Sequence, residues 1–431
     1  MPMVTDVKNI LVFPAGTEIG MEILDALKYS KFVRVFGGTS VRCHAQFVFE
    51  NYIEGLPFVD EDSFVDAIND VIDEYKIDYV YPAHDSVLTK LALNRDRLHA
   101  VLVAAETETV EICRSKNKTY AHLAGADYLP RSYKGAEDVP GYPVFIKPSV
   151  GQGAQGARLV EDEKRLREAL SEGVEYAVCE YLPGREFTVD CFTDRHGKLR
   201  LVSPRSRARI RAGISVRSEH FEPDEQVQAI AEDINQRFKF RGAWFFQLKE
   251  NSEGQYRLME VAPRIAGTMA VTRNTGVNLP MLTLFDLWDY DVELIQNGGE
   301  LLLDRSFIAR FDTDISYDRV YVDFDDTIVV KDKVNGLLMM FLYQARDKGK
   351  ELILLTKHRK DIYESLEKYA IAPGLFTEII HIKPEDSKIE HIKPHSIFID
   401  DSFAERVKVS RACNIPVFDL DMVESLLDWR G

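Results

Sequence analysis

The sequence predicts a multidomain protein that combines α/β and α+β architecture, and three observations support this fold class. Its 431 residues correspond to about three domains at ~150 residues each. An apolar run at 10–13, a glycine turn and a helical pattern begin a parallel βα layer. A second βα series begins at Val320, after a stretch from Cys113 to Leu303 in which lysine and glycine clusters appear among strands and helices. We therefore expect three successive domains.

Composition and charge limit the classes of partner. The chain has 54 Lys and Arg against 70 Asp and Glu residues, a net charge of −16, so it lacks the basic balance typical of nucleic-acid binding. A local basic groove around 205–211 stays open. Five scattered cysteines without a Cys-x-x-Cys pair favour reduced thiols over disulfides or a zinc site. No signal peptide or apolar run of ~20 residues is visible, so we expect a cytoplasmic protein without a nucleic-acid or membrane partner.

We expect residues 1–112 to form a small open α/β layer. The apolar strand at 10–13 leads into Pro14-Ala-Gly16 and then a helix through Leu27. Another strand, Tyr79–Tyr81, ends in Pro82-Ala-His84-Asp85 before a second helix. Strands and helices that alternate in this way build a parallel sheet.

The expected second domain, residues 113–312, carries the first polar motifs. Lys147 ends a strand, and Gly151, Gly153 and Gly156 follow shortly after it. Glycines at this spacing let backbone amides close over phosphates, while the lysine supplies positive charge. A glycine-rich hairpin turn explains the same residues about equally well, so this motif alone decides nothing.

Further strands in this domain add acidic and amide groups. Glu180 and Glu186 flank a Pro-Gly turn, where they fit around a nucleoside or are the exposed acids of a hairpin. The strands at 244–247 and 258–262, if adjacent, bring an amide, a carboxylate and a guanidinium to one site, namely Gln247, Glu260 and Arg264. The first two suit Mg²⁺ and the third suits a transferring phosphoryl group.

In this order, residues 1–312 resemble the ATP-grasp superfamily, and especially the single-unit relatives of the carbamoyl-phosphate synthetase large subunit. The resemblance implies that ATP phosphates are bound by Lys116, Lys147, Gly151 and Gly153, adenine by Glu180 and Leu182, and ribose by Glu186. It also implies that Gln247 and Glu260 hold the metal and that Arg264 contacts the γ-phosphate. Arg207 and Arg211 would hold the acyl phosphate or the substrate carboxylate, unless the arginine run is a solvated strand face. Ala262 stands where many relatives have another metal-ligating residue, asparagine, which puts the turnover rate in doubt.

This resemblance implies a carboxylate–amine ligase that uses ATP and Mg²⁺, or Mn²⁺, and proceeds through an acyl phosphate. Its partners would be a small-molecule carboxylate and an amine, and ATP-grasp relatives also suggest a possible homodimer. Two alternatives stay open. One is an ATP-dependent small-molecule kinase with a stable product such as carbamoyl phosphate, and the other is a nucleotide-binding regulatory module.

The expected third domain, residues 318–431, has polar residues at three strand ends. These are Asp323-Phe-Asp325-Asp326, Thr356-Lys357-His358 and Asp400-Asp401. Ligands of open parallel sheets bind beyond the carboxyl ends of the strands, so we expect these residues to converge. Carboxylates that converge repel one another unless a cation neutralises them, and hard oxygen ligands suit Mg²⁺. As single motifs, each aspartate is equally well explained as a helix N-cap.

Such a site predicts phosphoryl chemistry. A carboxylate beside Mg²⁺ attacks phosphorus, and a second carboxyl group, from Asp325, reaches the leaving oxygen as a general acid. Thr356 offers a hydroxyl to phosphate. Lys388 is the first candidate for the phosphate-binding lysine and Lys383 is the second.

Residues 318–431 thereby resemble a haloacid-dehalogenase-type (HAD) phosphatase with a Rossmann-like sheet. The resemblance implies an aspartyl-phosphate at Asp323, acid/base work by Asp325, and Mg²⁺ held by Asp323, Asp400 and the main chain of Asp325, supplemented by Asp401. Asp326 stands where many relatives have glycine. The spacing between motifs leaves no room for a large cap domain. The substrate would be a phosphate ester of the ligase substrate or product, although an inactive scaffold stays open.

Overall fold

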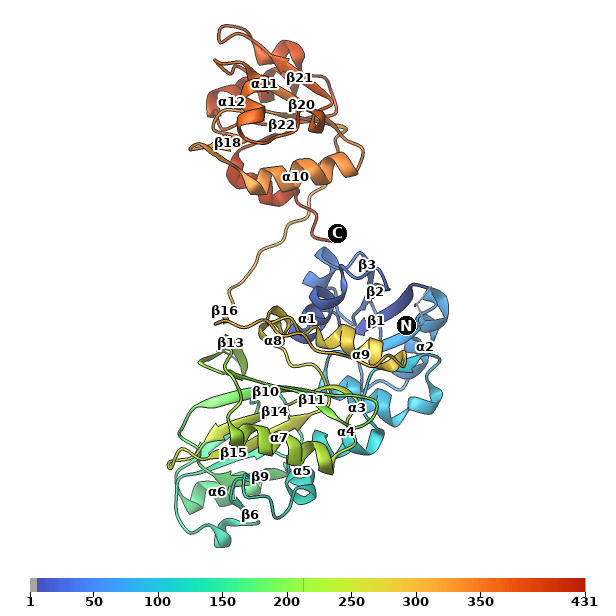
Figure 1. Cartoon of the computed structure of the whole chain (residues 1–431), viewed down its shortest axis with the longest axis vertical. Coiled ribbons are helices and arrows are strands. Elements are labelled where there is room, and N and C mark those ends of the chain that lie inside the picture. The colour runs from blue at the N-terminus through green and yellow to red at the C-terminus, as the bar shows by residue number, and fades with distance from the viewer. Residues whose placement is uncertain (1–5, 212, 431) are drawn as a thin grey trace. The chain divides into compact units, whose positions relative to one another are not determined.

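The computed structural model describes residues 6–211 and 213–430, which fall into two compact units, Met1–Phe307 and Ile308–Gly431 (Figure 1). Residues 305–317, which span the boundary between the two units, carry no helix or strand. The sequence predicts a connection within 304–318 and a further domain boundary at 112, and the boundary at 112 stays a prediction. Within the described residues, no helix has the length and apolar character needed to cross a membrane.

The first unit begins with a parallel five-stranded sheet in the order β3-β2-β1-β4-β5, which confirms the predicted open layer. The last four residues of β1, Ile10–Phe13, are apolar and buried, as expected for a strand covered by helices. Thr17 caps the helix that follows, because its side chain accepts a hydrogen bond from the Gly20 amide. The elements are β1 (Lys8–Phe13), α1 (Glu18–Leu27), β2 (Val33–Gly38), β3 (Asn51–Ile53), α2 (Phe64–Tyr75), β4 (Tyr79–Pro82), α3 (Asp85–Leu93), β5 (Val101–Leu102), α4 (Thr107–Arg114) and α5 (Lys116–His122).

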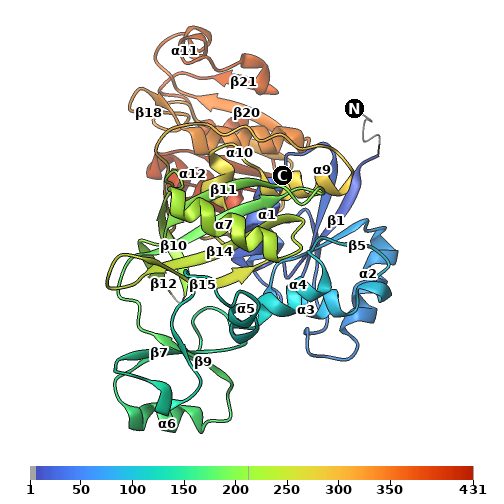
Figure 2. The same cartoon turned by 60° about the horizontal axis from the view of Figure 1, so that its bottom comes forward.

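Two antiparallel four-stranded sheets follow, in the orders β6-β9-β7-β8 and β11-β10-β14-β15. Helix α7 lies on the second sheet (Figure 2), where its apolar face packs against Trp244 and Phe246. The ring of Trp244 stacks on Phe240 with centroids 4.1 Å apart. The elements are β6 (Ser132–Tyr133), β7 (Val144–Pro148), β8 (Arg158–Val160), α6 (Glu163–Leu170), β9 (Tyr176–Glu180), β10 (Glu186–Thr193), β11 (Leu199–Ser206), α7 (Glu225–Arg237), β14 (Gly242–Glu250) and β15 (Tyr256–Ala262).

A small antiparallel sheet, β12-β13-β16, joins the arginine run to the end of the first unit. Its strands are β12 (Arg209–Arg211), β13 (Ile214–Glu219) and β16 (Leu302–Asp304), while α8 (Ala270–Asn274) and α9 (Leu279–Leu287) lie between β15 and β16 in the chain. Asp304 pairs with both Arg209 and Arg217, so ion pairs reinforce this short sheet.

The second unit is a parallel five-stranded sheet in the order β21-β20-β17-β22-β23, with a two-stranded hairpin, β18-β19, after its central strand. The predicted parallel strands are present. The elements are β17 (Arg319–Val322), β18 (Val329–Val330), β19 (Lys333–Val334), α10 (Gly336–Asp347), β20 (Glu351–Thr356), α11 (Ile362–Lys368), β21 (Glu378–His381), the 3₁₀ turn η5 (Lys388–His391), β22 (Ser396–Ile399), α12 (Phe403–Cys413) and β23 (Val417–Phe418).

Candidate functional sites in the two units

A cavity of about 220 Å³ in the first unit is lined by residues from both four-stranded sheets. The loop after β7 and the β12-β13 hairpin complete its wall. Ten of the residues singled out in the sequence line this cavity: Lys116, Lys147, Gly151, Gly153, Glu180, Leu182, Glu186, Arg207, Gln247 and Glu260. Residues from positions 116 to 260 therefore meet around one space large enough for a small molecule.

The ammonium group of Lys147 is largely shielded from solvent where it lines this cavity. Its side chain is only 6% exposed, its Nζ donates to the Met259 carbonyl at 2.8 Å, and it lies 5.3 Å from the ring centroid of Tyr120. Burial penalises the ammonium form and lowers the pKa of Lys147 to about 8. An anion in the cavity would favour the ammonium form and raise this pKa.

Gln247 and Glu260 face each other across two neighbouring strands. They are direct register partners of β14 and β15, and both line the cavity. Directly opposed side chains on one face of a sheet lie close together, so an amide oxygen and a carboxylate oxygen are available to one cation. Ala262, two residues further along β15, has no oxygen to add, and its partner across the strands is Phe245.

Glu186 and Glu180 are both tied by cations. Arg207 Nε donates to Glu186 at 2.7 Å, and Lys249 Nζ lies 3.6 Å from the same carboxylate. Glu180 accepts a hydrogen bond from the Arg131 backbone amide at 2.9 Å, and the guanidinium groups of Arg131 and Arg257 lie 3.4 and 3.6 Å from its carboxylate. Arg207 also donates to the Gly213 carbonyl at 2.9 Å, so in this structure it links the hairpin to β10. A substrate carboxylate would have to compete with Glu186 for Arg207.

Two predicted residues lie outside the cavity wall. Arg264 forms a bidentate ion pair with Asp85, at 2.6 and 2.7 Å, in an adjoining cavity of about 30 Å³ that shares Lys116, Gly151 and Glu260 with the first. Burial raises the pKa of Asp85, but the neighbouring Arg264 outweighs it and the net shift is downward. The guanidinium of Arg211 lies 5.5 Å from the centroid of the Phe307 ring, and Arg211 is exposed.

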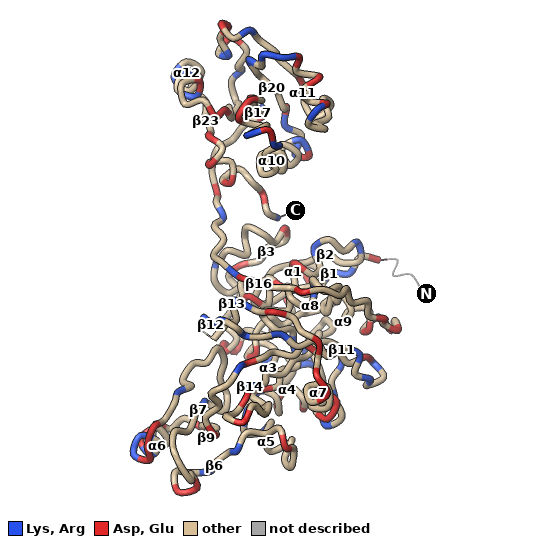
Figure 3. Tube along the Cα trace, turned by 60° about the vertical axis from the view of Figure 1, so that its left-hand side comes forward, with Lys and Arg blue, Asp and Glu red and all other residues tan. Residues whose placement is uncertain are grey.

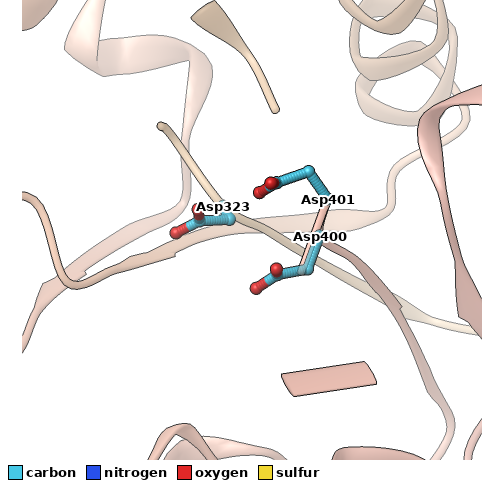
Figure 4. Close-up of side chains that lie close together, drawn as sticks. All are labelled: Asp323, Asp400 and Asp401. Carbon is cyan, nitrogen blue, oxygen red and sulfur yellow. The ribbon is translucent and has the colours of Figure 1, made fainter. Parts of the chain in front are cut away.

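The second unit gathers three carboxylates at one edge of its parallel sheet. Oxygens of Asp323, Asp400 and Asp401 all lie within 4.8 Å of one another (Figure 4). Asp323 follows β17 and Asp400 follows β22, and these strands are direct neighbours, so the predicted convergence of strand ends is present. Three hard oxygen donors at this spacing fit a divalent cation such as Mg²⁺.

Lys388 bridges two of these carboxylates. Its Nζ is 2.7 Å from Asp323 and 2.7 Å from Asp400, and its side chain is 3% exposed. Burial raises the pKa of Asp323 to about 6, against the opposing charge of Lys388. For Lys388, burial favours the neutral amine, but the two carboxylates outweigh it and the pKa rises. Lys383, the second candidate, is exposed, and among the described residues only the Lys388 ammonium contacts both Asp323 and Asp400.

The remaining predicted residues surround this cluster. Thr356 ends β20 and is fully buried, and the interaction of its hydroxyl with the Asp323 carboxyl opposes the rise in the pKa of Asp323. The side chain of Asp325 turns to His358, with both carboxylate oxygens 2.9 Å from Nδ1. Asp326 has a φ of +49°, a conformation that glycine adopts more easily, and this explains why glycine suits the position.

Three contacts were missed by the sequence analysis, namely those of Lys249, Asp85 and His358. Lys249 alternates with Gln247 on β14, a signal that was available. Asp85 and Arg264 are 179 residues apart, and nothing local in the sequence links them. His358 stands two residues after Thr356, within the motif Thr356-Lys357-His358, but the motif alone gives the histidine no role.

Three protein families match parts of the chain. Residues 173–297 match the family described as ATP-grasp in the biosynthetic pathway with Ter operon, and residues 111–197 match the carbamoyl-phosphate synthase L chain ATP-binding domain. Residues 376–416 match a family of HNH endonucleases, whereas the sequence had suggested a HAD phosphatase there. The first two matches together span 111–297.

The carbamoyl phosphate synthase large chain of Clostridium acetobutylicum is 22% identical over 213 residues, which are 46% of this chain and 20% of that protein. The chain therefore matches only about a fifth of this curated relative.

Solved structures show the fold. The biotin carboxylase of Campylobacter jejuni is 18% identical with a TM-score of 0.57, and covers 69% of this chain and 75% of its own. The biotin carboxylase domain of the Hydrogenobacter thermophilus 2-oxoglutarate carboxylase, described with MgADP and bicarbonate, is 17% identical with a TM-score of 0.58, over 69% and 74%. The L-amino acid ligase of Bacillus licheniformis is 20% identical with a TM-score of 0.51, over 66% and 75%. The chain thus contains an ATP-grasp fold related to carbamoyl-phosphate synthase and biotin carboxylase.

Proposed function

We propose that the protein is a bifunctional enzyme. The first unit acts as an ATP- and Mg²⁺-dependent ligase that joins a small-molecule carboxylate to an amine, and the second unit acts as a phosphatase on a phosphate ester. Mn²⁺ is an alternative metal. Each activity has its own site, and the two need not share a substrate.

The shared cavity of the first unit carries the ligase proposal. Lys147 and Lys116 supply positive charge for phosphates, while Gln247 and Glu260 would hold Mg²⁺ at the same cavity. The bound metal would neutralise phosphate charge. The γ-phosphoryl group passes to a carboxylate oxygen as its bond to ADP breaks. The amine then attacks the acyl carbon, phosphate leaves, and the amine loses a proton.

Product analysis separates the ligase from its alternatives. A ligase releases ADP and phosphate in equal amounts, and only when both carboxylate and amine are present. A kinase accumulates a phosphorylated product without the amine. ATP binding without ADP release across a broad panel of substrates would instead favour a regulatory module, as the missing ligand at Ala262 allows.

The contact of Lys388 with both Asp323 and Asp400 carries the phosphatase proposal. Asp323 attacks phosphorus, the bond to the leaving oxygen breaks, and Asp325 gives that oxygen its proton. A water molecule, losing a proton to Asp325, then cleaves the aspartyl-phosphate. Mg²⁺ held by Asp323, Asp400, Asp401 and the Asp325 main chain would screen the approach of two anions. Thr356 and Lys388 would bind the phosphate.

Substitution Asp323→Asn tests the phosphatase against the endonuclease that the family match at 376–416 suggests. Because an amide is a far weaker nucleophile, we expect hydrolysis of an aryl phosphate to fall at least ~10³-fold, the range seen when a catalytic nucleophile is removed. The matched control is Asp326→Asn, at an exposed neighbour, which should retain activity.

The endonuclease alternative makes a different prediction with the same variants. Asp323 lies outside residues 376–416, and the two strands in that segment, β21 and β22, are separated in the sheet by β20 and β17. Lys and Arg are interspersed with Asp and Glu along the described chain (Figure 3). Cleavage of duplex DNA that persists in Asp323→Asn, with no hydrolysis of aryl phosphate by the unmodified protein, would replace the phosphatase proposal.

A further inference from the structure

The imidazole of His358 holds the carboxylate of Asp325 in the second unit. Nδ1 lies 2.9 Å from both carboxylate oxygens, and Nε2 lies 2.8 Å from the Ser365 hydroxyl. A carboxyl group keeps an oxygen that accepts a hydrogen bond whether or not its other oxygen is protonated, so we assign the proton of this contact to Nδ1, which donates it to Asp325. The Ser365 hydroxyl is then free to donate to Nε2.

Several elements fix this ring. The side chain of His358 is only 11% exposed, and its ring packs edge-on against Phe324, with centroids 5.0 Å apart. Ser365 belongs to helix α11, and its residue is buried. His381, at the end of β21, contacts the His358 carbonyl at 2.6 Å through Nε2. Groups from three separate segments therefore hold both the backbone and the ring of His358.

Asp325 itself has little else to hold it. Its side chain is 53% exposed, and among the described residues no other side chain donates to its carboxylate. An exposed aspartate rotates freely about its side-chain bonds unless a partner restricts it. The direction of this carboxylate is therefore set by a buried, rigid histidine.

We propose that His358 is a positioning residue for Asp325, which it orients to protonate the leaving oxygen of a phosphate ester. The inference rests on the proposed phosphatase. While the phosphorus–oxygen bond of the ester breaks and the bond to Asp323 forms, the proton moves from Asp325 to the leaving oxygen. The water that cleaves the aspartyl-phosphate returns a proton to Asp325. The imidazole gains and loses nothing in this cycle.

The dependence of the rate on the leaving group tests the role of His358. An alkyl alcohol leaves only with a proton, whereas 2,4-dinitrophenolate leaves without one, so general acid catalysis, typically 10²–10⁴-fold, matters only for the first. In the full-length protein, we expect His358→Ala to lower kcat/KM for glycerol phosphate at least ~10-fold, a part of that factor. The value for 2,4-dinitrophenyl phosphate should change less than ~3-fold, because its leaving group needs no acid.

Two further variants make the test specific. Asparagine places an amide N–H near the position of Nδ1, so His358→Asn should restore most of the rate with glycerol phosphate. Ser365→Ala frees Nε2 and should give a smaller loss with the same selectivity. If His358→Ala does not fold, Ser365→Ala tests the same role of the histidine.

Equal losses with both phosphate esters would mean that the histidine only supports the fold, and that result overturns the inference, as does no loss with either. Asp325→Ala removes the proposed acid itself, so its selective loss of rate with glycerol phosphate is the largest that a change at His358 should cause. Asp323→Asn tests the phosphatase activity itself, because it removes the proposed nucleophile. If that variant hydrolyses both esters at the unmodified rate, the proposed function fails and this inference fails with it.

Discussion

At the scale of single residues, two buried lysines show opposite responses to burial. Lys388 lies between two carboxylates, and its pKa rises although burial favours the neutral amine. Among the described residues, Lys147 has no anion in hydrogen-bond contact, so burial dominates and its pKa falls to about 8. The positive charge of Lys388 is thus balanced by carboxylates of the protein, whereas the charge of Lys147 would be balanced by a bound anionic ligand.

This difference predicts a pH dependence for nucleotide binding. Phosphate oxygens beside Lys147 would favour the ammonium and raise its pKa, so binding takes up a proton wherever the free lysine is deprotonated. The Kd for ATP should therefore rise as pH increases above about 8, by up to ~10-fold per pH unit. Calorimetric titration between pH 7 and 9.5 measures this. Lys147→Met should bind more weakly with a flat profile, and an unchanged slope in that variant would assign the effect to another group.

At the scale of elements, Gly213 of the β12-β13 hairpin packs closely against Gly153 in the loop after β7. Gly213 has a φ of +78°, and a Cβ there would lie 2.4 Å from the Gly153 carbonyl oxygen. Both glycines line the cavity of about 220 Å³ in which we propose that ATP binds. An added methyl group must therefore displace the loop or the hairpin.

Comparison with Gly254 isolates this contact. Gly254 has a φ of +77°, but a Cβ there would meet no atom of the described part of the chain within 4 Å. Both Gly213→Ala and Gly254→Ala should cost about 1–2 kcal/mol for a left-handed conformation, measured by denaturant unfolding. Only Gly213→Ala should also raise the Kd for ATP, by about 10-fold if a further ~1.4 kcal/mol of contact energy is lost. Equal affinities of the two variants would separate the hairpin from nucleotide binding.

The same elements mark where sequence reasoning succeeds and where it stops. The buried parallel strands, such as β1 and β17, are continuous apolar runs, and the aspartates after β17 and β22 could be expected to meet because strand ends share an edge. The hairpin strands β18 and β19 have two residues each, too few to show a period. The pairing of β16 with β13 and of Arg264 with Asp85 depends on contacts far apart in sequence, which local patterns do not encode.

At the scale of the whole molecule, each unit has its own hydrophobic core. In the first unit, large clusters centre on β1 and on Trp244. In the second, Val320, Leu354 and Ile399 belong to a separate cluster around β17. Residues 305–317, which connect the units, contain no helix or strand. Cores of this size are sufficient for each unit to unfold cooperatively by itself.

Calorimetry of the full-length chain should therefore show two transitions that respond to different changes. A non-hydrolysable ATP analogue at 100 times its Kd should add about 2.7 kcal/mol to the stability of the first unit only, because a ligand stabilises the unit that binds it. Asp323→Asn should shift only the other transition, since it removes one of the two carboxylates that share Lys388. Limited proteolysis within 305–317 should release both units still folded. If the nucleotide instead raises a single transition for the entire chain, the two units are one cooperative system, and the independence of their sites is wrong.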